Sequence, residues 1–187
     1  MTNTLPIPCK SPGRSPGSSA IGRRQRGLTM VEMMIALTVA AILLSVGVPG
    51  FLDLIRGKHL AAAASDLKAD LDFARSEAQK RNRRVLVCPA GPVANTCGTG
   101  TDWAAGWLVC VDADANGACD AATTTAPNPL RQQAAVNAAV TITGPNGAMR
   151  FTGGGEAPVA YAFTVGGTWS GATAKSIAVE TSGLVLN

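Results

Sequence analysis

The chain has 187 residues, room for one modest domain, and a formal net charge of +4. The first 27 residues hold five of the sixteen Lys and Arg and none of the twelve Asp and Glu. Residues 28–187 therefore carry eleven basic and twelve acidic side chains, a net charge of −1, which does not indicate global attraction to nucleic acid. The composition gives no support for an enzyme or a cofactor. The sole histidine, His59, has no nucleophile partner nearby in sequence, and the glycine run 153–155 has no helix signal after it.

Residues 1–27 are rich in Pro, Ser and Gly, and we predict a targeting leader that is cleaved off and takes no part in the fold. Residues 28–52 are predicted to form the transmembrane half of a long helix. From Met33 to Leu52 there is no formal charge, and about twenty apolar residues span a hydrocarbon core of about 30 Å. The leader's charges predict a single-pass orientation with the N-terminus in the cytoplasm. These charges are Lys10, Arg14, Arg23, Arg24 and Arg26.

Glu32 is an acid at the start of this apolar segment. A carboxylate is costly in lipid, so one interpretation is a functional site. The other is an acid at the headgroup level that suits the positive N-terminus of the helix. The residues alone leave both open.

Residues 53–82 are predicted to continue the same helix in amphipathic form. The whole helix would run from about Leu28 to Asn82. We expect Pro49 to bend it, because proline removes a backbone hydrogen bond and clashes with the preceding turn. One apolar stripe follows spacings of three and four residues: Leu60, Ala64, Leu67, Leu71, Ala74 and Ala78.

Residues 83–187 predict strands separated by Gly, Pro and Asn turns. An antiparallel sheet packed on the amphipathic half of the helix would bury both apolar faces, which predicts an α+β fold. Trp103, Trp107 and Trp169 are expected to pack in the core rather than bind a ligand. The expected strands are Arg84–Cys88, Gly106–Val111, Ala139–Thr143, Met149–Thr152, Val159–Val165, Ser176–Thr181 and Leu184–Leu186.

Four cysteines follow the apolar segment, in addition to Cys9 in the leader. An even number beyond a membrane span predicts disulfides in an oxidising compartment. Three pairings are possible. We favour Cys88–Cys97 and Cys110–Cys119, because each pair brackets a short segment that is rich in Gly, Asn or Asp. Neither pair has the Cys-x-x-Cys spacing of a zinc or redox motif.

Gly27 followed by Leu-Thr-Met-Val-Glu closely resembles the cleavage site of type IV prepilins. Pro49 falls where such pilins carry a helix-kinking proline. The chain resembles the GspH/FimT family of pilin-like proteins over further residues: Leu67, Asp70, Leu71, Ala74, Arg75, Ser76, Glu77, Ala78, the Lys80–Arg84 run, Trp103, Gly106, Trp107, Leu108, Val109 and the Asp-Ala-Asp-Ala-Asn-Gly of 112–117.

This resemblance implies cleavage between Gly27 and Leu28 by prepilin peptidase, N-methylation of Leu28, and a type IV pilin-like fold for residues 28–187. Glu32 would neutralise the new amine of a neighbouring subunit, so that neither charge is left alone among apolar helices. The expected protein is a minor pilin or pseudopilin of the bacterial inner membrane. Residues 53–187 would form its periplasmic domain, and it would assemble with other pilin subunits into a type II secretion pseudopilus or a type IV pilus.

The only dense basic run after the leader is Lys80, Arg81, Arg83 and Arg84. One interpretation is that these cations contact DNA phosphates or anionic lipid. The other, which we favour, is that they offset the negative C-terminal end of the helix. The alternative function is a DNA-binding minor pilin acting in DNA uptake during transformation. Some relatives that take part in DNA uptake carry Gly-Arg-x-Arg near the C-terminus. This chain has Gly183 followed by Leu-Val-Leu at the comparable place, so both arginines are missing.

Asp112, Asp114 and Asn116, followed by Gly117, resemble the first half of a calcium loop. Asp120 is available as a further ligand, but the twelfth position is Thr123 instead of a bidentate Glu. A disulfide-flanked Asn-Gly turn explains the same residues, so we expect no metal here.

Overall fold

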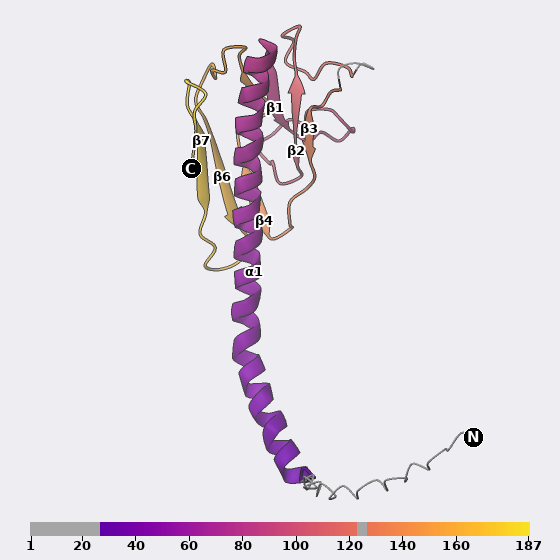
Figure 1. The fold of residues 1–187 in the computed structure, drawn as a ribbon, viewed down its shortest axis with the longest axis vertical. Coiled ribbons are helices and arrows are strands. Elements are labelled where there is room, and N and C mark those ends of the chain that lie inside the picture. The colour runs from indigo at the N-terminus through magenta and orange to yellow at the C-terminus, as the bar shows by residue number, and fades with distance from the viewer. Residues whose placement is uncertain (1–26, 123–126) are drawn as a thin grey trace, which may run out of the picture. The chain divides into compact units, whose positions relative to one another are not determined.

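The computed structural model describes residues 27–122 and 127–187, so most of the predicted leader lies outside the described residues (Figure 1). The chain divides into two units, Met1–Leu43 and Leu44–Asn187. Helix α1 runs from Met30 to Arg81, close to the predicted bounds, and strands follow it. They are β1 (Val85–Pro89), β2 (Trp107–Val111), β3 (Arg131–Gln133), β4 (Val140–Thr143), β5 (Met149–Phe151), β6 (Tyr161–Gly167), β7 (Lys175–Val179) and β8 (Val185–Leu186).

Helix α1 ends in a Schellman motif. Asn82 adopts a left-handed φ of 48°. Its N–H donates to the Gln79 carbonyl at 3.2 Å, and the Arg83 N–H donates to the Ala78 carbonyl at 3.2 Å. These two bonds satisfy carbonyls that the last helical turn leaves without partners. The chain then turns directly into β1.

The strands form two antiparallel sheets, with the orders β3-β2-β1-β5 and β4-β6-β7-β8. The antiparallel prediction is confirmed, but the expectation of a single sheet was wrong, because strand pairing depends on contacts distant in sequence. β3 was not predicted as a strand. A backbone hydrogen bond links the chain before β2 to β4 of the other sheet: the backbone N–H of Trp103 donates to the Ile142 carbonyl at 2.9 Å.

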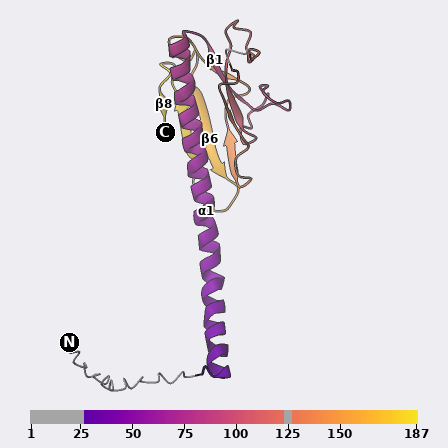
Figure 2. The same ribbon diagram turned by 45° about the vertical axis from the view of Figure 1, so that its right-hand side comes forward.

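One hydrophobic core joins the second half of α1 to both sheets. Figures 1 and 2 show this part of the helix lying along the strands. The predicted apolar stripe is buried throughout, and Leu67, Leu71, Ala74 and Ala78 are fully inaccessible. The Trp103 and Phe163 rings meet edge to face, with their centroids 4.9 Å apart. The periodicity therefore identified the helix face that carries the packing.

β1 and β2 are buried on both faces. Val85 and Val87 point into the core, so the alternate residues Leu86 and Cys88 lie on the other face. Two disulfides, Cys88–Cys97 and Cys110–Cys119, hold loop residues over this second face. The structure thus has the favoured cysteine pairing.

Candidate functional site

The start of α1 carries the residues predicted for processing and assembly. Gly27, Leu28 and Thr29 precede the helix. The Thr29 hydroxyl accepts a hydrogen bond from the Glu32 N–H at 3.2 Å, and the Thr29 carbonyl accepts one from the Met33 N–H at 3.2 Å. Thr29 is therefore the N-cap, and Thr-x-x-Glu is the sequence of a capping box. The residues alone could have revealed this signal, which the sequence analysis missed.

The Glu32 side chain is exposed, and within 27–122 and 127–187 its carboxylate makes no hydrogen bond or ion pair. Capping uses the backbone N–H of Glu32 and leaves its carboxylate open to a partner. The structure therefore does not decide between the two interpretations of Glu32. Pro49 lies within the bounds of α1, and its role in assembly stays a prediction.

The N-terminal half of α1 is apolar and exposed. One window of 18 residues has a mean hydropathy of 2.3, and no part of this window is buried. By length and composition the helix is therefore able to cross a membrane. Soluble monomers rarely expose a continuous apolar surface of this extent, so this segment needs lipid or partner helices. The exposed apolar residues are Leu28, Met30, Val31, Met33, Met34, Ile35, Leu37, Val39, Ile42, Leu43, Leu44, Val48, Phe51, Leu52, Leu54 and Ile55.

Asp70 is a buried acid of α1 that was not counted in the predicted apolar stripe. It is 7% exposed; one carboxylate oxygen accepts the Trp107 Nε1–H at 2.9 Å, and the other accepts the Arg131 Nη1–H at 2.8 Å. The Arg131 guanidinium also lies 3.9 Å from the centre of the Phe73 ring. The spacing contained the signal, because Asp70 stands three residues after Leu67 on the same helix face.

Three of the four cations of the basic run have acidic partners. Glu77 accepts hydrogen bonds from Arg81 at 2.8 Å and Lys80 at 3.0 Å. These bonds, that from Arg81 first, hold the pKa of Glu77 below its ordinary value. Arg84 lies 3.8 Å from an Asp112 oxygen and donates to the Ala115 carbonyl. Arg83 is exposed, and its side chain has no such partner in the described ranges.

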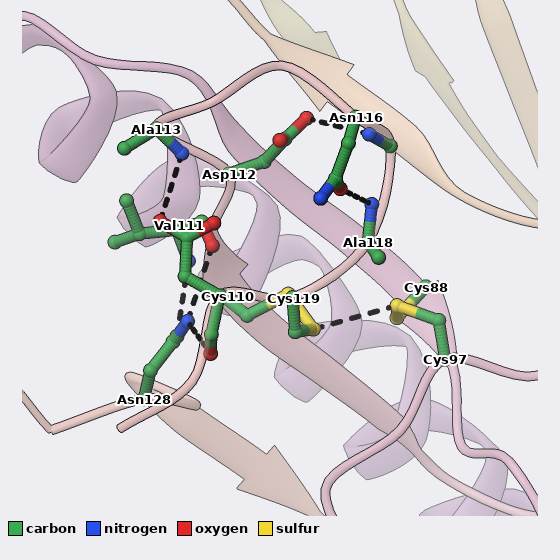
Figure 3. The surroundings of a disulfide bond; sticks show 12 residues. Cys88, Cys97, Cys110, Val111, Asp112, Ala113, Asn116, Ala118, Cys119 and Asn128 are labelled. Atoms are coloured by element: carbon green, nitrogen blue, oxygen red, sulfur yellow. Dashed lines mark hydrogen bonds between the residues drawn. A yellow bond between two sulfur atoms is a disulfide. The ribbon is translucent and has the colours of Figure 1, made fainter. Parts of the chain in front are cut away.

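The acidic residues of the predicted calcium loop come together. Ligand oxygens of Asp112, Asp114 and Asp120 lie within 4.8 Å of one another. The side chain of Asn116 is engaged in the loop itself: its oxygen accepts the Ala118 N–H at 2.7 Å, and its amide donates to Asp114 at 2.8 Å. Figure 3 shows this loop beside the two disulfides, where the Cys97 and Cys119 sulfurs are 3.5 Å apart.

The residues considered for enzyme chemistry lie apart from these features. His59 is exposed on α1, and Trp103 and Trp107 are fully buried in the core. Trp169 is half-buried against the same core. The prediction that the tryptophans pack rather than form a ligand platform agrees with these positions.

Comparison with known proteins places the chain in a family. The model of the family described as type II transport protein GspH matches residues 63–183, and that of the prokaryotic N-terminal methylation motif matches residues 22–48. No curated protein matches the sequence. Two crystal forms of the type IV minor pilin FimU from Pseudomonas aeruginosa strain PAO1 are similar in structure. The first is 22% identical with a TM-score of 0.49, covering 69% of this chain and 87% of FimU. The second is 19% identical with the same TM-score, covering 67% and 90%. Since the GspH match extends over more than half of the sequence, the chain belongs to the GspH family and is a pilin-like subunit.

Proposed function

We propose that the chain is a minor subunit of a pilus-like fibre, anchored in the bacterial inner membrane until it is assembled. The observation that carries this proposal is the exposed apolar half of α1, which follows the N-cap Thr29 and contains one acid, Glu32, with an open carboxylate. The GspH family description makes a type II secretion pseudopilus the first fibre to test, ahead of a type IV pilus. Residues 53–187 would then form the periplasmic domain, where an oxidising environment would maintain its disulfides.

Processing would occur at the Gly27–Leu28 peptide bond. Both residues lie outside the helix, and Leu28 is 67% exposed, so a peptidase would not have to unwind α1 to reach the bond. Cleavage would create an α-amine at Leu28, which we expect to be methylated. Thr29 would remain to cap the helix in the processed chain.

Assembly would pack the apolar half of α1 against the helices of other subunits. In lipid such packing comes from close side-chain fit, which small residues such as Ala36, Ala40 and Ala41 allow. The Glu32 carboxylate would pair with the terminal amine of a neighbour. Removing one partner of a buried ion pair costs roughly 3–5 kcal/mol, so this pair would set the position of each subunit in the fibre.

The experiment compares Glu32→Ala and Glu32→Gln with Thr29→Ala in cells that assemble the fibre. Gln keeps the size of the side chain and the capping-box sequence but removes the charge. Thr29→Ala removes the hydroxyl cap at about 1 kcal/mol and leaves Glu32 in place. Mass spectrometry of each mature N-terminus reports cleavage and methylation, and the sheared fibre fraction reports incorporation.

We expect all three variants to be cleaved after Gly27, and both Glu32 variants to be absent from fibres while Thr29→Ala is incorporated. Incorporation of Glu32→Gln at the wild-type level would refute the charge pairing. Recovery of the native protein with its leader attached, and never in a fibre, would refute the proposed function as a whole.

The ion pairs of the basic run favour the structural function over DNA uptake. Lys80 and Arg81 contact Glu77, and Arg84 lies beside Asp112, so three of the four cations already have acidic partners. Arg83 alone offers little electrostatic attraction to a phosphate backbone. We therefore propose that the run stabilises the end of α1 and the loops around it.

A further inference from the structure

A cluster of three carboxylates lies in and beside the loop closed by the Cys110–Cys119 disulfide. Asp112 follows β2, Asp114 lies two residues further, and Asp120 comes directly after the second cysteine. Their ligand oxygens approach within 4.8 Å of one another. Like charges at this separation repel, and a bound cation would offset this repulsion.

Asp112 provides a second observation, because part of its carboxylate is buried without a partner. The residue is 0% exposed. Its Oδ2 accepts the Gly117 N–H at 3.2 Å and lies 3.8 Å from Arg84 Nη1. Its Oδ1 is buried and has no hydrogen-bond partner. A buried polar oxygen is unfavourable unless it has a hydrogen-bond partner or binds a metal. Asp112 Oδ1 is therefore an unused ligand atom on one residue of the cluster.

The formal charge of the cluster matches a divalent cation. Three carboxylates and the Arg84 guanidinium give a net charge of −2. The cluster offers only oxygen ligands, which suit hard cations rather than zinc or copper. Asp112, Asp114 and Asp120 occupy positions 1, 3 and 9 of a twelve-residue calcium loop, and Gly117, with a φ of +85°, is the glycine at position 6.

The backbone around Asp120 holds it close to Asp112. The Asp120 N–H donates to the Val111 carbonyl at 3.0 Å, and Asn128 Nδ2 donates to the Asp120 carbonyl at 2.8 Å. One Asp120 oxygen accepts the Ala113 N–H at 2.9 Å, which leaves the other available. Asp114 is exposed, so a cation is able to enter from solvent.

We propose that Asp112, Asp114 and Asp120 bind one calcium ion, which neutralises the buried Asp112 oxygen and stiffens the loop. Because position 12 is Thr123 rather than a bidentate Glu, the expected affinity is that of weak extracellular sites, with a Kd of about 0.1–1 mM. Magnesium is expected to bind less well, since its strict octahedral geometry does not suit an irregular loop. This proposal departs from the expectation of a purely structural Asn-Gly turn.

The test uses the full chain in detergent micelles, stripped with EDTA and then titrated with calcium chloride by calorimetry. We expect one saturable site. The melting temperature should rise by about 3–6 °C in 10 mM calcium and by less in 10 mM magnesium. Asp114→Asn and Asp120→Asn should each weaken binding at least tenfold and abolish the rise. Asp66→Asn, which changes an exposed acid on α1, is the matched control and should bind as the wild type does.

Comparing melting temperatures in EDTA and in calcium separates a binding role from a folding role. Asp114 is exposed, so Asp114→Asn should melt with the wild type in EDTA and below it in calcium. No saturable heat and no thermal shift at 10 mM calcium would overturn the proposal. Wild-type binding by both Asp114→Asn and Asp120→Asn would overturn the assigned ligands. An equal shift with magnesium would overturn the choice of calcium.

Discussion

Replacing Asp70 by alanine should destabilise the domain more than any change of an exposed acid on α1. The substitution leaves the Trp107 Nε1–H buried without an acceptor and removes a hydrogen bond to a charged group, a loss of about 1.5–3 kcal/mol. The Arg131 side chain is 48% exposed, so its ion pair adds only about 0.2–1 kcal/mol. The expected cost of Asp70→Ala is therefore about 2–4 kcal/mol.

Thermal unfolding of the full chain in detergent, followed by near-UV circular dichroism, measures this cost. At about 2–4 °C per kcal/mol, Asp70→Ala should lower the melting temperature by about 5–15 °C. Asp70→Asn keeps an acceptor for Trp107 and should lose less. Arg131→Ala loses the ion pair and the contact with Phe73, which is about 1 kcal/mol. If Asp70→Ala melted with the exposed control Asp66→Ala, the buried hydrogen bond would not be stabilising.

Two further predictions concern the end of α1. The bonds from Arg81 and Lys80 lower the pKa of Glu77, so their stabilisation is present above its ordinary value of about 4.5 and is lost as the pH falls through the lowered pKa. Glu77→Gln should therefore lose less stability on acidification below pH 4.5 than the wild type, and parallel melting curves against pH would contradict this. Asn82→Gly should be tolerated in the left-handed position, whereas the free energy of unfolding of Asn82→Ala should be about 1 kcal/mol lower than that of Asn82→Gly. Denaturant titration would measure the difference, and equal stability of the two variants would contradict it.

Local patterns predicted those elements whose structure depends on neighbours in sequence. The helix stripe from Leu60 to Ala78 needs only a spacing of three and four, and it is buried as expected. β3 was missed because Arg131–Gln133 is short and polar, and it becomes a strand by pairing with β2. The division into two sheets was missed for the same reason, since no local signal says that β4 pairs with β6 rather than with β2.

For the candidate sites too, sequence spacing indicated positions but not the contacts between residues that are distant in sequence. The spacing of Asp112 and Asp114 was visible in sequence, but the burial of Asp112 depends on its position at the end of β2 and on Arg84. Asp70 was not counted in the predicted stripe, although it follows Leu67 by three residues on the same helix. Its partners Trp107 and Arg131 lie far along the chain, so sequence spacing could indicate the face of the helix but not the contacts.

The covering of β1 and β2 has a consequence for recombinant production. Their second apolar face includes the buried Leu86 and Leu108, and two cross-links hold loop residues over it. Made in a reducing cytosol, the chain would lack these cross-links, and both leucines would lose their cover to loop fluctuation. Export, or oxidative refolding, is therefore the suitable preparation for biophysical work on this domain.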